Sequence, residues 1–218
     1  MNDYKRQVTI QSDLDFKKTT NDIIKIGNRL YSRGLLYATS GNISSVLKMD
    51  PFELAITASG VDKGNMSADN VLIVDSNGKV IDGGGKPSAE TLLHLAVIRN
   101  ADAKSVIHTH SIWSTILSKR YLSHGFLELN GYEMLKAFDG NATHNVSEIL
   151  PVFENSQNMV EVSEKVSRYL KEDPKTHGFV LSGHGLYTWG KNLSVAMRYI
   201  EAIEFLLEVM GREISLER

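Results

Sequence analysis

Two histidines end an apolar run in the segment 105–111 (SVIHTHS). Because successive residues of a strand point to opposite faces, His108 and His110 are expected to share one face, with Thr109 turned away. Two imidazoles on one rigid element suit a transition metal, Zn²⁺ above all. The chain has seven histidines, so two can fall at this spacing by chance. The pair alone leaves metal binding open.

A third histidine, His184, lies between Gly183 and Gly185. Flanking glycines let the backbone approach another segment closely and leave the imidazole unobstructed. With His108 and His110 it would complete a three-histidine set, typical of a catalytic zinc with an open coordination position. The chain has no cysteine, so thiolate ligands are excluded. We interpret the other histidines as packed or solvated: His94, His124, His144 and His177.

Three loops of small polar residues accompany these histidines, at 39–44, 58–60 and 83–88. Glycine and asparagine tolerate backbone shapes that aim N–H groups inward, although the first loop is equally a hairpin turn. The third loop runs into a predicted helix, and a helix N-terminus is a natural phosphate seat. The spacing matches neither a Walker nor a Rossmann motif, so no nucleotide is predicted. Three converging loops favour a small phosphorylated ligand.

The surrounding pattern predicts an α/β protein. Helical periodicity covers residues 13–32, about 88–98, 112–119, 158–171 and a long C-terminal stretch capped by Asn192. Strands are predicted at 53–57, 71–75, 80–81, 105–108 and on both sides of 183–185. The segment 121–140 has no clear pattern. We expect one domain over 1–218, with residues 1–12 as a loose segment.

Composition excludes several classes of function. With 24 basic and 26 acidic residues and no basic stripe, the 218-residue chain is not expected to bind nucleic acid or a membrane surface. Its start lacks the apolar stretch of a secretory signal, and no apolar run approaches the ~20 residues that span a bilayer. A cytoplasmic protein is the expectation.

Five ordered motifs together resemble the class II aldolase/adducin family: 41–44 (GNIS), 57–60 (TASG), 86–90 (KPSAE), 108–110 (HTH) and 183–185 (GHG). The resemblance implies a three-layer α/β/α sandwich with a largely antiparallel central sheet. It also implies a homotetramer with sites near subunit interfaces and one Zn²⁺ per subunit. Within the family, 131–134 (GYEM) and 184–190 (HGLYTWG) resemble the subgroup that dehydrates 5-methylthioribulose 1-phosphate in methionine salvage.

The resemblance also assigns residues. It makes His108, His110 and His184 the zinc ligands and Glu133 the acid–base residue of the dehydratases. Glu90 matches the base of the sugar-phosphate aldolases, although a glutamate at a helix start also simply favours the helix dipole. Contacts to the phosphorylated sugar substrate are implied at Gly41, Asn42, Ser59, Gly60, Ser88 and Ala89. Lys86 and Lys136 are further candidate phosphate partners.

Two other functions remain open at this point. A class II zinc aldolase acting on fuculose or rhamnulose 1-phosphate would share the metal and the loops, but no tyrosine follows Tyr199 to act as its proton donor. Sugar-phosphate epimerases have an aspartate where Glu90 stands. A non-catalytic module of the adducin type would be expected to lack metal ligands, whereas all three histidines are present.

Overall fold

The structure, a computed structural model, describes residues 2–217 and is built around one nine-stranded sheet. The strand order is β4-β3-β2-β1-β5-β9-β8-β7-β6, and the pairs are antiparallel except β7 with β8. The strands are β1 (Asn42–Met49), β2 (Phe52–Thr57), β3 (Val71–Val74), β4 (Val80–Asp82), β5 (Ser105–Thr109), β6 (Phe126–Asn130), β7 (Ser147–Phe153), β8 (Gly178–Leu181) and β9 (Gly185–Gly190).

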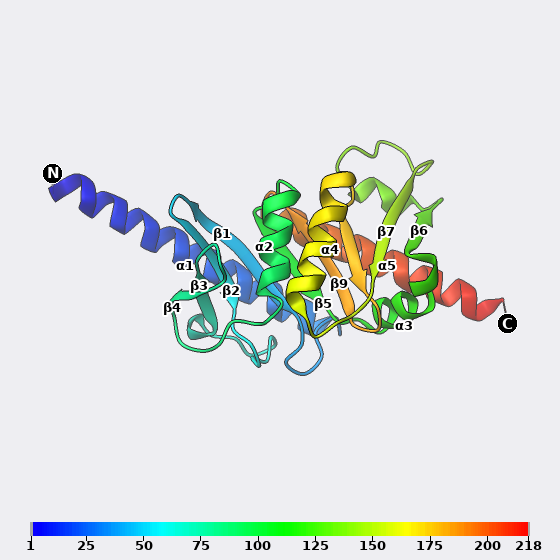
Figure 1. The fold of residues 1–218 in the computed structure, drawn as a ribbon, viewed down its shortest axis with the longest axis horizontal. Helices are drawn as coiled ribbons and strands as arrows, with labels where there is room; N and C mark the ends of the chain where they lie inside the picture. Colours follow the sequence, from blue (N-terminus) through cyan, green and yellow to red (C-terminus); the bar gives the residue numbers. More distant parts are fainter. Residues whose placement is uncertain (1, 218) are drawn as a thin grey trace.

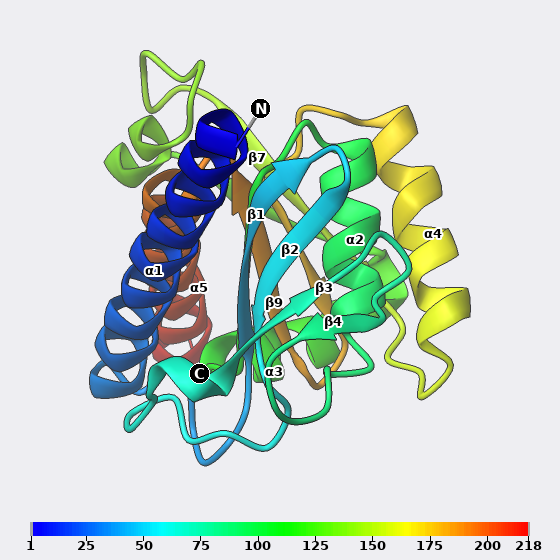
Figure 2. The same ribbon diagram turned by 90° about the vertical axis from the view of Figure 1, so that its left-hand side faces the viewer.

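Helices cover both faces of the sheet (Figures 1 and 2). One face carries α1 (Asn2–Ser32), α3 (Ile112–Arg120) and α5 (Leu193–Leu216), and the other carries α2 (Thr91–Asn100) and α4 (Met159–Glu172). Short 3₁₀ helices are η1 (Ala68–Asn70), η2 (Leu122–His124) and η3 (Glu133–Ala137). The predicted three-layer sandwich with a largely antiparallel sheet is therefore confirmed. Within residues 2–217, no helix is both long and apolar enough to cross a membrane.

The alternation of strand residues builds a core on each face. On β5, Ile107 packs toward α5 while Val106 packs toward α2 and α4. On β9, Leu186 joins the first core and Tyr187 the second. Both central strands are buried on both faces, which gives the segments that carry the site a rigid support.

Local signals in the sequence mark several element ends. Asn192 caps α5, accepting a hydrogen bond from the Val195 N–H at 3.0 Å. Gly34 follows the end of α1 with a positive φ of 68°, as expected of a helix C-cap. These boundaries agree with the prediction.

One prediction differs from the structure, and one segment without a prediction proves to be ordered. The segment 1–12, predicted to be loose, is helical from Asn2 onward. Neither glycine nor proline interrupts the chain before Gly27, so backbone hydrogen bonding continues past the part of α1 that packs on the sheet. The unassigned segment 121–140 contains η2, β6 and η3.

Candidate metal centre and phosphate pocket

His108 lies on β5, between β1 and β9 in the middle of the sheet, and His110 directly follows the last residue of that strand. They share a face as predicted, and their Nε2 atoms lie 2.8 Å apart. Thr109 points the other way and donates a hydrogen bond to Glu204 Oε1 of α5 at 2.6 Å. His108 is fully buried, stacked on the Tyr187 ring, with centroids 3.8 Å apart. The strand period thus presents two imidazoles to one point.

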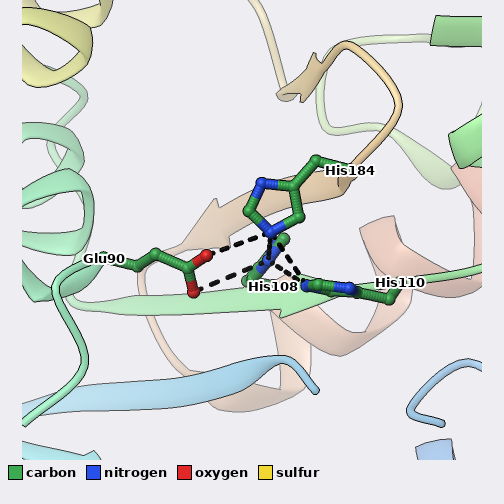
Figure 3. Close-up of side chains that lie close together, drawn as sticks. All are labelled: Glu90, His108, His110 and His184. Carbon is green, nitrogen blue, oxygen red and sulfur yellow. Dashed lines mark hydrogen bonds and ion pairs between the residues drawn. The ribbon is translucent and has the colours of Figure 1, made fainter. Parts of the chain in front are cut away.

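His184 reaches the same point from the turn between β8 and β9 (Figure 3). Its Nε2 lies 3.3 Å from that of His108 and 3.0 Å from that of His110. A Cβ on Gly185 would lie 2.0 Å from the Thr109 carbonyl oxygen, so only glycine lets this turn close onto β5. The flanking glycine therefore serves a close backbone approach, as predicted from the sequence.

Glu90 completes a group of four ligand atoms, all within 4.8 Å of one another. It precedes the first residue of α2 but makes no side-chain cap hydrogen bond. Its carboxylate instead faces the histidines, with Oε1 at 3.0 Å from His184 Nε2 and Oε2 at 3.7 Å from His108 Nε2. Burial opposes ionisation of Glu90, but hydrogen bonds from the His184 ring and the Asn42 amide act in the other direction, and its pKa lies well below its usual range.

The protonation of these rings suits a divalent metal. Desolvation lowers the pKa of His108 well below its usual value and that of His110 to about 4. His108 Nδ1 lies 3.0 Å from the Leu186 carbonyl oxygen and donates to it, which leaves its Nε2 lone pair directed at the other rings. The three Nε2 atoms lie between 2.8 and 3.3 Å from one another. Three imidazole nitrogens that converge in this way suit a shared cation, with Glu90 as an optional fourth ligand.

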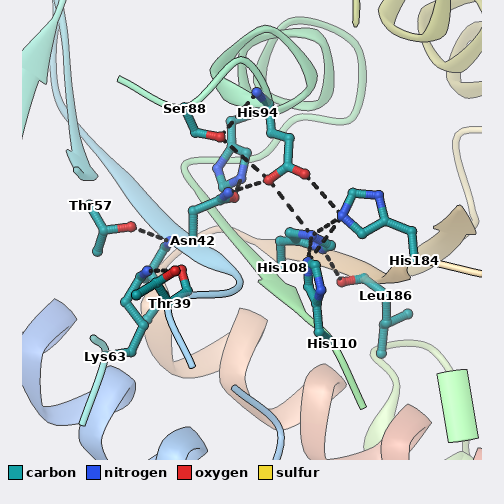
Figure 4. Close-up of polar contacts among 12 residues, drawn as sticks. Thr39, Asn42, Thr57, Lys63, Ser88, His94, His108, His110, His184 and Leu186 are labelled. Atoms are coloured by element: carbon teal, nitrogen blue, oxygen red, sulfur yellow. Dashed lines mark hydrogen bonds and ion pairs between the residues drawn. The ribbon is translucent and has the colours of Figure 1, made fainter. Parts of the chain in front are cut away.

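A polar chain that runs through Asn42 and His94, both labelled in Figure 4, holds the Glu90 carboxylate on the side away from the histidines. Asn42 Nδ2 donates to Glu90 Oε2 at 2.5 Å, and Asn42 Oδ1 accepts a hydrogen bond from His94 Nε2. His94 Nδ1 then accepts from the Ser44 hydroxyl at 2.7 Å. Burial lowers the pKa of His94 to about 4, so its ring is neutral. The interpretation of His94 as a packed, hydrogen-bonded residue is confirmed. Its partner Asn42 connects it to Glu90, His108, His110 and His184, together the metal group.

The predicted phosphate loops meet beside the metal group in a cavity of about 140 Å³. Gly41 has a φ of 70°, and a Cβ there would lie 2.6 Å from the His108 carbonyl oxygen, so the first loop packs directly on β5. The predicted loop residues in the lining are Gly41, Asn42, Ser59, Gly60 and Ser88. Ala89 is exposed and is not among the lining residues.

Lys63 also lines this cavity, and the sequence did not single it out. Lys63 is only 1% exposed, and its Nζ donates to the carbonyl oxygens of Thr39 at 3.1 Å and Val61 at 2.8 Å. Its position three residues after Gly60 is the only local signal that associates it with a predicted loop.

Glu133 lies apart from the residues gathered around the metal group. It begins η3, its side chain is 70% exposed, and it pairs with Lys136 and His144. The four-residue group does not include it. Within one chain, the structure therefore brings together Glu90 and the three histidines but not the second predicted catalytic glutamate.

Glu204, on the far side of β5, is a buried carboxyl group. Burial raises its pKa from an ordinary value of 4.5 to about 7, against hydrogen bonds from Ser111 and Thr109 that lower it. When the pH lies between these two pKa values, the folded chain keeps a proton on Glu204 that the unfolded chain has lost. The free energy of unfolding therefore falls as the pH rises through this range.

Glu204→Gln removes this titrating group. We therefore expect the free energy of unfolding of the variant, relative to that of the unsubstituted chain, to rise by up to roughly 3 kcal/mol between about pH 4 and about pH 8. Urea unfolding at both pH values measures the difference. Glu208→Gln, at a 46% exposed side chain on the same helix, is the control and should show a constant difference. A constant difference for Glu204→Gln as well would contradict an elevated pKa.

Curated relatives match nearly the whole chain. A methylthioribulose-1-phosphate dehydratase of Methylococcus capsulatus is 38% identical over 207 residues, covering 94% of this chain and 99% of the relative. A protein of the same name from Pseudomonas fluorescens is 41% identical over 193 residues, covering 88% and 91%. A dehydratase is a lyase, so these relatives confirm the prediction that the chain is an enzyme of that class.

A solved structure agrees on the fold. An L-fuculose-1-phosphate aldolase from Thermus thermophilus superposes with a TM-score of 0.74 at 22% identity, covering 93% of this chain and 98% of the other. At that identity the likeness concerns architecture alone. The family model described as the class II aldolase and adducin N-terminal domain matches residues 21–210. The chain therefore belongs to the class II aldolase and adducin family.

Proposed function

We propose that the chain is a zinc-dependent dehydratase that converts 5-methylthioribulose 1-phosphate to 2,3-diketo-5-methylthiopentyl 1-phosphate and water in methionine salvage. The observation that carries the proposal is the convergence of His108, His110, His184 and Glu90 beside a cavity lined by the predicted phosphate loops. The relatives named methylthioribulose-1-phosphate dehydratase are about 40% identical to this chain along most of its length. The donor set of three imidazoles and a carboxylate suits zinc.

The reaction removes a proton from C3 and a hydroxyl group from C4, and the resulting C3 enol loses its hydroxyl proton and takes up a proton at C4 to give the diketone. The C3 proton is acidic because the neighbouring C2 carbonyl can accept the resulting charge. When bound, the zinc ion supplies a Lewis acid that polarises this carbonyl. Glu90, whose side chain accepts a hydrogen bond from Asn42 and which lines the cavity, is the proposed proton acceptor.

The C4 hydroxyl group is a poor leaving group and needs a proton as it departs. Glu133 is the proposed proton donor, as in the dehydratases that this chain resembles. In the single chain its exposed carboxyl group is poorly suited, because the hydrogen bond from Lys136 lowers its pKa. Burial against another protein surface would displace that contact and raise the pKa.

We therefore propose a homotetramer in which Glu133 of one copy reaches the metal group of a neighbour. Exposed apolar side chains on α3 and α5 support an interface close to the site. Ile112, two residues after His110, is 57% exposed, and Ile116 and Phe205 are about half exposed. Contact between copies would bury these side chains, in the manner of an oligomer interface.

The test is a product assay on the zinc-loaded protein with 5-methylthioribulose 1-phosphate. Dehydration gives one diketone that retains every carbon and has lost one water. Aldol cleavage would instead give two carbonyl fragments, which mass spectrometry separates from the diketone. Formation of the two fragments, or no turnover of a metal-loaded tetramer, would overturn the proposed function.

A further inference from the structure

Lys63 is an unusual lysine because its cation is buried. The side chain lies under helix α1, where the Lys63 carbonyl oxygen and Met66 crowd Gly27. Desolvation lowers the pKa of Lys63 to about 8, although the charges of Asp62 and Glu90 act in the opposite direction. Buried charges in proteins are normally paired with an opposite charge or serve in binding or catalysis.

The neighbours of Lys63 leave part of its bonding capacity free. An ammonium group has three N–H donors, and carbonyl oxygens of Thr39 and Val61 accept two of them. Thr39 begins the first small-residue loop and Val61 directly follows the second, so Lys63 ties those two loops together. Figure 4 shows Lys63 beside Thr39. The third N–H remains for a ligand.

The cavity that Lys63 lines has further donors and an excess of small residues. Ser40, in the same lining, has a buried hydroxyl oxygen with no hydrogen-bond partner among residues 2–217. Gly60 has a φ of 74° and nothing within 4 Å of a Cβ built there. A buried cation beside an unpartnered hydroxyl group, with space for a ligand next to both, is complementary to a phosphate dianion.

The two lysines considered from the sequence are placed differently. Lys136 is paired with Glu133 on η3, apart from the cavity. The Lys86 side chain is exposed, and only its backbone carbonyl serves the site, accepting the Ser59 N–H at 2.9 Å. Neither is among the lining residues.

We propose that Lys63 is the cation of the phosphate subsite, donating its third N–H to an oxygen of the sugar 1-phosphate, with the Ser40 hydroxyl as a second donor. The assignment rests on the proposed function, since it names the group that recognises the phosphate of that substrate. It makes Lys63 the residue that selects phosphorylated over unphosphorylated sugars. Because Lys63 holds two loops, its contact also fixes the loops around the phosphate.

The experiment compares Lys63→Met with the matched surface variant Lys86→Met. Calorimetric titration with inorganic phosphate is expected to show binding to the unsubstituted protein and to Lys86→Met, and at least about 10-fold weaker binding to Lys63→Met. With the sugar phosphate, kcat/KM of Lys63→Met should fall by about 10- to 100-fold. With the unphosphorylated sugar, Lys86→Met should react like the unsubstituted protein, and the loss in kcat/KM caused by Lys63→Met should be at least about 10-fold smaller than with the sugar phosphate.

Equal phosphate affinity in Lys63→Met and Lys86→Met would overturn the assignment, as would absence of phosphate binding by the unsubstituted protein. If Lys63→Met does not fold, a crystal structure of the unsubstituted protein with inorganic phosphate decides. Lys63 Nζ within hydrogen-bond distance of the ion supports the proposal, and a phosphate bound without it refutes it. If phosphate binds through Lys63 but the methylthio sugar is not dehydrated, the proposed function fails while this assignment stands.

Discussion

Replacing His184 by alanine is expected to weaken zinc binding by more than about 100-fold. Loss of a residue that only hydrogen-bonds to a metal ligand lowers metal affinity by up to about 100-fold, and loss of a ligand itself should cost more. The ring supplies one of three converging Nε2 atoms and also contacts Glu90. Without it, the remaining ligands are His108 on β5, His110 just after this strand, and Glu90 just before α2. Elemental analysis of the purified protein measures the metal, and the product assay should show a parallel loss of dehydration.

The control for this variant is His124→Ala, which removes an exposed histidine at the end of η2. It should keep one metal ion per chain and full activity. Chelation of the unsubstituted protein should abolish activity, and zinc should restore it. Full metal content in His184→Ala would show that the metal binds elsewhere in the molecule and would contradict the three-histidine centre.

The histidines could be found from the sequence because each sits in a strong local pattern. A period of two residues places His108 and His110 on one face of any strand. Glycines on both sides of His184 mark a turn that must approach another segment closely. The apolar run before His108 and the glycines around His184 are local features of the sequence. The strand and the turn that they predict therefore did not depend on contacts with distant segments.

Lys63 could not be found in this way, because its burial depends on contacts remote in sequence. Helix α1 packs over the segment that contains it, at Gly27, and the acceptor at Thr39 lies 24 residues away. Nothing near Lys63 in the sequence distinguishes it from a solvated lysine. His94 shows the same limit, since its partners Asn42 and Ser44 belong to another element.

The unassigned segment 121–140 was obscured for another reason. Strand β6 alternates exposed and buried residues, with Leu127 and Leu129 inside. Phe126 is 44% exposed, so an apolar residue stands on the outer face of an edge strand and masks the alternation. The structure also ends β6 just before the stretch that carries Glu133, whose distance from the metal group no local pattern predicts.

Glu133→Gln is expected to lower kcat by about 10²- to 10⁴-fold, the contribution of a proton-transfer group. Glutamine keeps the size and the hydrogen-bonding oxygen but cannot deliver the proton. Because Glu133 is not part of the four-residue group that could hold a metal ion, metal content should be unchanged. Product formation is measured at equal zinc loading. Full activity in this variant would remove Glu133 from the chemistry.

Mixing two inactive variants tests whether Glu133 acts across an interface. In a tetramer that combines Glu133→Gln with His184→Ala chains, some sites pair an intact metal centre from the first with an intact Glu133 from the second. If neighbouring copies share each site, random mixing restores about a quarter of the activity, because both members of the pair must be right. If each chain uses its own Glu133, every site has one defect and the mixture stays inactive. Since the structure leaves Glu133 exposed and apart from the histidines, we expect restoration.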